Sequence, residues 1–201
     1  MSKVIKFSVV KADMNKESIS GKRGQFGFTL IELIVVIVIL GILAAVALPR
    51  FVNLQRDARI AKLQAARGSV LAASALVHAT ALARAGVADA APCPGGGGTA
   101  NNIVSGAGTV CTESGVVNMT NAYPTVTAIG TAGILSMAGL TGIFNPTAAQ
   151  LQVEGYTYAD AGAVATFGIV GATTPAGCVF TYTQAAANAA PMVGTPTTTG
   201  C

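Results

Sequence analysis

The chain has 201 residues, of which 52% are hydrophobic and only 10% are charged, and its formal net charge is +4. Residues 1–27 hold six of the twelve basic residues but two of the eight acidic ones, so the remainder of the chain is neutral. A basic surface on a folded domain would indicate nucleic-acid binding, whereas a charge confined to a leader does not. We therefore expect no specific nucleic-acid partner.

Residues 28–48 form an apolar run of 21 residues in which Glu32 is the only charged residue. At about 1.5 Å per residue, a helix of this length measures roughly 30 Å, which is enough to cross the hydrocarbon core of a bilayer. Because the basic leader precedes this run, the positive-inside rule places the leader in the cytoplasm and the C-terminal part on the other side. The sequence thus predicts a single membrane-spanning helix.

Glu32 is the unusual residue of this run. An ionisable side chain at the centre of a bilayer costs on the order of 2.5–3.5 kcal/mol and marks a candidate functional site. One interpretation is that Glu32 lies one turn into the helix, where the helix N-terminus favours a negative charge. The other is that cleavage between Gly27 and Phe28 creates an α-amine, which pairs with Glu32 of the same chain or of a neighbouring chain.

The residues around this junction resemble those of a known family. They are Lys22-Arg23-Gly24-Gln25-Phe26-Gly27, then Phe28-Thr29-Leu30-Ile31-Glu32, and Pro49. This pattern is similar to the class III signal and N-terminal helix of type IV prepilins and pseudopilins, and the resemblance extends over about residues 22–70. The continuation at residues 49–59 resembles pilins of the mannose-sensitive haemagglutinin type most.

The resemblance implies a fold, a maturation route and a function. The fold is α+β, type IV pilin-like, with a long N-terminal helix, transmembrane in its first half, packed on a small antiparallel β-sheet. A prepilin peptidase cleaves after Gly27, Phe28 is N-methylated, and assembly machinery in the inner membrane polymerises the subunits. In such a filament Glu32 neutralises the amine of an adjacent subunit and sets the register.

The implied product is a structural, non-enzymatic subunit of a type IV pilus used for adhesion, surface attachment or motility. The precursor is a single-pass inner-membrane protein with a periplasmic C-terminus, and the homo-oligomeric helical filament is extracellular. Within the family, the alternative is a pseudopilin of a type II secretion system. Outside it, the alternative is a secreted or membrane-anchored binding domain.

Two other processing routes compete with prepilin cleavage. Ala45-Val46-Ala47 has the form of a secretory cleavage site, and its use would release a soluble protein that starts at Leu48. The apolar region before that site is longer than usual for a signal peptide, and Glu32 would serve no purpose in it. A plain membrane anchor explains the apolar run but not the junction sequence.

The helical pattern continues beyond the apolar run through residues 49–85. Pro49 is expected to bend the helix near residues 45–49 instead of ending it, and Gly41 is a second weak point. Small and apolar residues then recur at spacings of three and four. Such a stripe allows close approach of a sheet or another helix, although plain helix propensity also accounts for the alanines. Its members are Leu54, Ala58, Ala61, Ala65, Gly68, Ala72, Leu76, Ala79 and Ala83.

The composition changes near residue 86, and residues 86–125 are predicted to form an exposed, flexible, Gly-rich loop, the αβ-loop of the family. The glycine run at 95–98 lacks the Gly-Lys-Ser/Thr of a phosphate-binding loop. Residues 126–201 are expected to form an antiparallel β domain with strands at 153–158, 163–170 and 178–183, the first two joined by a four-residue loop. Residues 125–129 are a further candidate strand, and 133–140 fit either a short helix or a buried strand.

All four cysteines follow the membrane segment, where an oxidising compartment would permit disulfides. Four cysteines allow three connectivities, of which we predict the sequential one, Cys93–Cys111 and Cys178–Cys201. The spacing does not match a zinc site, and we expect no metal or other cofactor. His78 is the sole histidine, and the acidic residues Asp89, Glu113, Glu154 and Asp160 are scattered. No catalytic residues are expected, because acid–base chemistry needs positioned partners.

Overall fold

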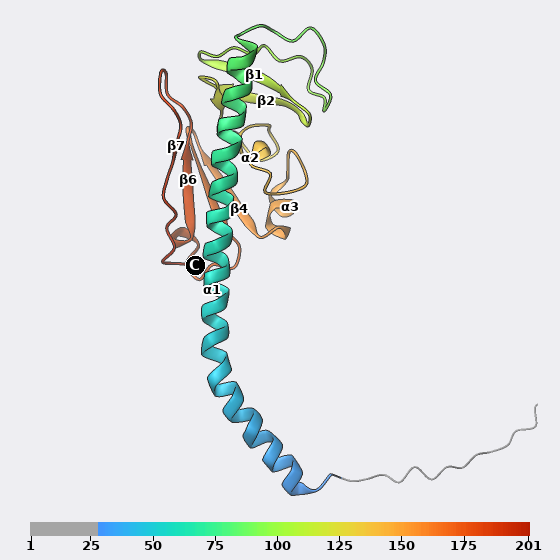
Figure 1. Cartoon of the computed structure of the whole chain (residues 1–201), viewed down its shortest axis with the longest axis vertical. Coiled ribbons are helices and arrows are strands. Elements are labelled where there is room, and N and C mark those ends of the chain that lie inside the picture. Colours follow the sequence, from blue (N-terminus) through green and yellow to red (C-terminus); the bar gives the residue numbers. More distant parts are fainter. Residues whose placement is uncertain (1–27) are drawn as a thin grey trace, which may run out of the picture. The chain divides into compact units, whose positions relative to one another are not determined.

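The computed structural model describes residues 28–201, so the leader and its last residue, Gly27, lie outside the described residues. The chain divides into two compact units between Val46 and Ala47. Helix α1, Leu30–Arg84, runs through both units and includes Pro49 (Figure 1). The prediction that the helix continues past Pro49 and ends near residue 84 is confirmed. The bend near Pro49 concerns the orientation of the two units and stays a prediction.

In the first unit, the described residues are Phe28, Thr29 and the first part of α1. All of them, from Phe28 to Val46, are exposed. The apolar part of α1 is long and apolar enough to cross a membrane, and none of it is buried within the chain. A core helix of a globular domain would have its apolar side chains covered by neighbouring elements. This stretch therefore needs lipid or another protein to remove its apolar surface from water.

The second unit contains two antiparallel sheets beside the rest of α1 (Figure 1). The first sheet has the order β1-β2-β3, with β1 at Ala107–Thr112, β2 at Gly115–Thr120 and β3 at Tyr123–Pro124. The second has the order β4-β5-β6-β7, with strands at Tyr156–Ala161, Val164–Ile169, Val179–Thr183 and Met192–Val193. Two short helices, α2 at Ile134–Met137 and α3 at Ala148–Val153, and a 3-10 turn, η1 at Pro175–Gly177, complete it. The predicted α+β class is confirmed.

The prediction of a flexible loop over residues 86–125 is wrong in its second half, which contains the first sheet. The β1–β2 hairpin is closed by a two-residue turn, because Thr112 pairs with Gly115. The glycine run before it is packed against this turn: a Cβ on Gly95 would lie 2.0 Å from the main-chain carbon of Ser114. Gly-rich composition therefore serves close backbone approach here.

The second sheet also differs from expectation at its start. Val153 is the last residue of α3 and not the first residue of a strand. This helix begins with a capping box formed by Thr147 and Gln150. The β4–β5 loop has two residues instead of four, since Ala161 pairs with Val164. Gly162 occupies the left-handed region there, with φ +61°, as a two-residue hairpin loop requires. Residues 125–129 form no strand, and the ambiguous segment 133–140 contains helix α2.

One face of α1 carries the core of the second unit. Leu63, Ala66, Val70 and Ala73 pack with the aromatic side chains of the second sheet, including Phe167 and Phe180, whose stacked rings have centroids 5.0 Å apart. Further along the helix, Val77 and Ala81 pack against the first sheet, with Val110, Val117 and Met119. Two sheets are thus held by successive turns of the same helix face.

Candidate functional site

Hydrogen bonds at the start of α1 give Glu32 a structural role within its own chain. Its Oε2 accepts hydrogen bonds from the main-chain N of Thr29 at 2.9 Å and from Thr29 Oγ1 at 2.8 Å. In return, the main-chain N of Glu32 donates to Thr29 Oγ1 at 3.3 Å. This reciprocal pair is a capping box, which satisfies donors that a helix N-terminus otherwise leaves free. Glu32 therefore has a local role in addition to any role between subunits.

The other two residues that we predict to take part in assembly, Gly41 and Pro49, are exposed. A Cβ added at Gly41 would meet nothing within 4 Å, so this glycine is not required by a contact within the chain. All nine members of the predicted small-residue stripe, from Leu54 to Ala83, are exposed. The stripe is therefore not packed into the core against either sheet, and among its members Leu76 borders a groove beside the first sheet. Of the two contacts considered from the sequence, close packing on a sheet of the same chain is not the one that this stripe makes.

The charges of the second unit are segregated. From residue 28 onward, every basic residue lies on α1, whereas residues 85–201 carry four acidic residues and no lysine or arginine. Three arginines of α1 donate to main-chain oxygens of the C-terminal segment: Arg56 to Thr198 at 3.4 Å, Arg59 to Cys201, and Arg67 to Gly194 at 2.8 Å. These bonds fasten the end of the chain to the helix.

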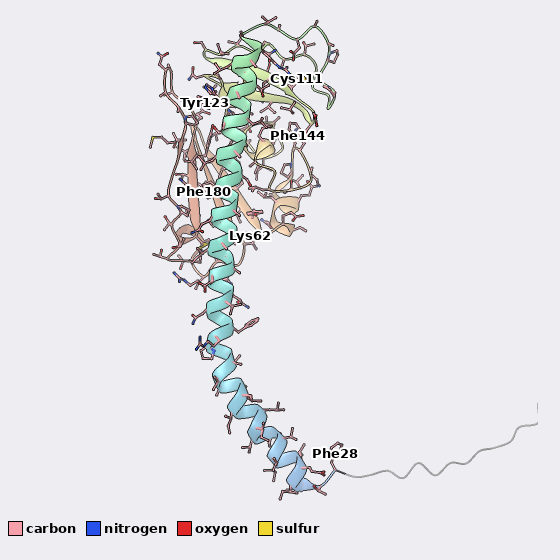
Figure 2. All side chains as sticks on the ribbon, viewed as in Figure 1. Phe28, Lys62, Cys111, Tyr123, Phe144 and Phe180 are labelled. Carbon is pink, nitrogen blue, oxygen red and sulfur yellow. A yellow bond between two sulfur atoms is a disulfide. The ribbon has the colours of Figure 1, made fainter. Side chains whose placement is uncertain are left out.

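Lys62 performs the same function for the second sheet. Its Nζ donates to the main-chain oxygen of Glu154 and lies 4.5 Å from the ring centroid of Tyr156. Figure 2 marks the position of Lys62 on α1. A cation over an aromatic face is attracted by the ring quadrupole. The helix is therefore attached to the start of β4 by polar contacts as well as by the apolar core.

The cysteine pairs lie at two ends of the second unit. The structure joins Cys93 to Cys111, with Cα atoms 5.5 Å apart, and Cys178 to Cys201, with Cα atoms 4.8 Å apart. Cys178 and Cys201 belong to the main core, whereas Cys93 and Cys111 form a small separate cluster with Ala100. These positions place one bridge under the Gly-rich segment and the other at the C-terminal segment.

Asp89 lies close to the first of these bridges, within 4.8 Å of the sulfur atoms of Cys93 and Cys111. Its carboxylate already forms an ion pair with Arg84 at 2.8 Å and accepts a hydrogen bond from Asn102 Nδ2 at 2.9 Å. Metal binding by cysteine requires the thiolate, which a disulfide does not offer. This cluster accordingly links the end of α1 to the segment that follows it.

His78 occupies a half-buried position against the first sheet. Its ring stacks on that of Tyr123, with centroids 4.0 Å apart, and its Nδ1 lies 3.3 Å from the main-chain oxygen of Ala122. These contacts use one ring face and one ring nitrogen for packing against β3. The geometry assigns His78 a structural role.

The comparisons with known proteins concern the N-terminal region first. Residues 22–48 match the family described as "Prokaryotic N-terminal methylation motif". The match covers Gly27, Phe28, Glu32 and the entire apolar run. The match supports the resemblance to type IV prepilins in the region that contains the predicted cleavage and methylation residues.

A relative extends this similarity. The chain is 54% identical over 50 residues to the type IV narrow pilus major component PilA5 of Thermus thermophilus, a match that covers 25% of this chain and 43% of that protein. The chain thus matches less than half of the length of this relative. No solved structure matches the chain. Together with the α+β fold, the two similarities support a structural protein of the pilin kind.

Proposed function

We propose that this chain is the structural subunit of a type IV pilus. In this proposal it is made as an inner-membrane precursor, cleaved after Gly27 by a prepilin peptidase and N-methylated on Phe28. Inner-membrane assembly machinery then polymerises it into an extracellular filament of identical subunits. The observation that carries the proposal is the uncovered apolar helix that begins within the residues that match the methylation motif.

The exposed surface of α1 supports this function physically. A helix with uncovered apolar residues is stable in lipid before assembly, and other copies can replace that lipid in a filament. The second unit has an exposed helix surface of its own, the stripe from Leu54 to Ala83, which consists mostly of Ala and Gly. Small side chains allow helix backbones to approach closely. The filament core would therefore be a bundle of α1 helices with the sheets outside.

Glu32 has two successive partners in this proposal. In the single chain its carboxylate is held by Thr29, next to the position where cleavage creates the amine of Phe28. During assembly the carboxylate pairs with the Phe28 amine of an adjacent subunit and sets the register of addition. Within an apolar bundle the paired state is favoured over one in which either charge stays unpaired, because an unpaired buried charge is costly.

The type II secretion pseudopilin is the second candidate. The resemblance of residues 49–59 to mannose-sensitive haemagglutinin pilins, and the two disulfides, favour the pilus over it. The surface filament would serve adhesion, attachment or motility, and the subunit would have no enzymatic activity. Deletion of the gene separates the two candidates. Loss of a pilus subunit removes surface filaments, whereas loss of a pseudopilin stops protein secretion.

The deciding experiment is the intact mass and N-terminal sequence of the protein sheared from cells. A chain that begins at N-methylated Phe28 supports prepilin processing. A mass lower by four hydrogens than that of the reduced chain supports two disulfides, and peptide mapping tests the pairs Cys93–Cys111 and Cys178–Cys201. A soluble chain that begins at Leu48 indicates an ordinary secreted protein. A membrane-bound chain that retains Met1 indicates a plain anchor.

A further inference from the structure

A groove of about 670 Å³ lies at the C-terminal end of α1, between the helix, the β1–β2 turn and residues 136–144. Apolar side chains line it, including Leu76, Met137, Ile143 and Phe144. Leu76 is 60% exposed and Ile143 is 45% exposed, so apolar surface remains open to solvent there. Figure 2 shows Phe144 and Cys111 at this end of the unit. Such a surface is suited to an apolar partner.

The charge at the groove is negative. Glu113, in the β1–β2 turn, lines the groove and is exposed. Arg84 also lines it, but its guanidinium is paired with Asp89. Within residues 28–201, Glu113 forms no ion pair. An apolar side chain accompanied by a free cation would therefore complement the groove.

Such a combination lies at the other end of the second unit. Leu54 lies three residues after Phe51 and four residues after Arg50, so on α1 it neighbours both of them. Phe51 is 63% exposed and Leu54 is 68% exposed. Of the six basic residues from residue 28 onward, Arg50 is the one with neither a hydrogen bond nor an ion pair within the described part of the chain. The segment thus offers an exposed aromatic ring and an unpaired cation on either side of Leu54.

The two surfaces are too far apart to meet within one chain. About 30 residues of α1 separate Phe51 from Thr80, which lines the groove, and at about 1.5 Å per residue this corresponds to roughly 45 Å. The contact must therefore be made between copies, with the base of one meeting the far end of another. A head-to-tail contact between different surfaces produces open helical filaments when its rotation does not close a ring.

We propose that the groove receives the Arg50–Leu54 segment of a second copy of this chain. Phe51 enters the apolar part beside Phe144 and Ile143, and Arg50 pairs with Glu113 at the rim. This inference rests on the proposed filament function and names one contact between copies that are offset by roughly 45 Å along the helix direction. The pair follows the charge segregation described above, because Arg50 lies on α1 and Glu113 lies in the turn of the first sheet.

Charge reversal in the full chain tests the pair. Arg50→Glu and Glu113→Lys place like charges opposite each other, so each is expected to lower the yield of sheared filaments by about tenfold or more. The double variant R50E/E113K restores the pair in reverse and is expected to return the yield to within about twofold of wild type. The matched control is Asp160→Lys, an exposed charge reversal on β4 outside the groove, which is expected to assemble normally.

The amounts of cleaved subunit in the membrane are measured in parallel, so that a folding defect is separated from an assembly defect. Phe51→Ala provides a second test, because truncation of an exposed side chain leaves the fold intact but removes the apolar contact. Normal filament yield in Phe51→Ala, or a double variant no better than the single ones, overturns the inference while the filament function stands. Absence of filaments made from the wild-type chain overturns the proposed function itself.

Discussion

Thr29 and Glu32 hold each other in both directions at the first turn of α1, through a carboxylate that accepts two hydrogen bonds and a hydroxyl that accepts one. The carboxylate therefore stabilises the helix start even in a single chain. Glu32 therefore has two properties that can be tested separately. One is its hydrogen-bonding capacity, and the other is its negative charge.

The charge of Glu32 is tested by Glu32→Gln beside Glu32→Ala. Gln keeps a side-chain oxygen that can complete a capping box, whereas Ala removes both the acceptor and the charge. We expect both variants to be inserted and cleaved, but to give about tenfold fewer filaments, because in the proposed filament the Phe28 amine of the adjacent subunit then lacks its counter-charge. Thr29→Ala, which weakens the capping box alone, is expected to assemble nearly as wild type. Normal filament yield in Glu32→Gln would show that the hydrogen bonds suffice.

The orientation of α1 is tested by two leucines on opposite faces. Leu63 is 0% exposed and Leu54 is 68% exposed. We expect Leu63→Ala to lower the free energy of unfolding of the unit Ala47–Cys201 by about 2–5 kcal/mol, since it leaves a cavity against the second sheet. Leu54→Ala is expected to change it by less than about 0.5 kcal/mol. Denaturant titration measures both, and equal effects would contradict the assigned buried face.

The packing of the glycine run is tested by Gly95→Ala. The added Cβ would lie 2.0 Å from the main-chain carbon of Ser114 and 2.3 Å from the nitrogen of Gly115, so the backbone must move. We expect a loss of about 1–3 kcal/mol in the free energy of unfolding. Gly68→Ala is the matched control, because its Cβ meets nothing within 4 Å. In an exposed helix position this change is expected to stabilise the chain by about 0.5–1 kcal/mol. A harmless Gly95→Ala would restore the idea of a freely flexible loop.

The stability of the second unit is expected to fall at high pH because of its buried tyrosines. Burial raises the pKa of Tyr182 from 10.0 to about 12, and its hydroxyl donates to the main-chain oxygen of Pro124 at 2.7 Å. Burial, reinforced by the charge of Asp160, likewise raises the pKa of Tyr158 to about 12. Between about pH 10 and pH 12 the folded chain binds more protons than the unfolded chain, so stability is complete below this window and is lost through it.

Tyr182→Phe isolates the contribution of one hydroxyl. At neutral pH we expect a loss of about 1 kcal/mol, because the Pro124 oxygen loses its donor. As the pH rises from 10 to 12, the variant is expected to lose less stability than the wild type, so that the difference between the two proteins shrinks. Thermal unfolding at a series of pH values measures this convergence. A constant difference across that range would contradict the role of Tyr182 ionisation.

Local sequence was sufficient where a feature depends on consecutive residues. The apolar run that begins at Phe28 and the end of α1 at Arg84 follow from composition and helical periodicity, which neighbouring residues define by themselves. The β1–β2 hairpin was missed because its turn, Glu113-Ser114, lacks the usual glycine-containing pair and its strands hold few large apolar residues. Val77 and Ala81, which cover these strands, are distant in the sequence.

The amino-acid sequence determined the helix that is long and apolar enough to cross a membrane, its junction motif and the α+β class, because hydrophobic length and motif spacing are properties of contiguous residues. Only the tertiary structure decided which face of α1 is buried. Alanines occupy both faces at the same helical spacing, so periodicity could not choose between Ala65 and Ala66. The larger Leu63, Val70 and Val77 fill the space against the two sheets, and this packing leaves the small-residue stripe uncovered.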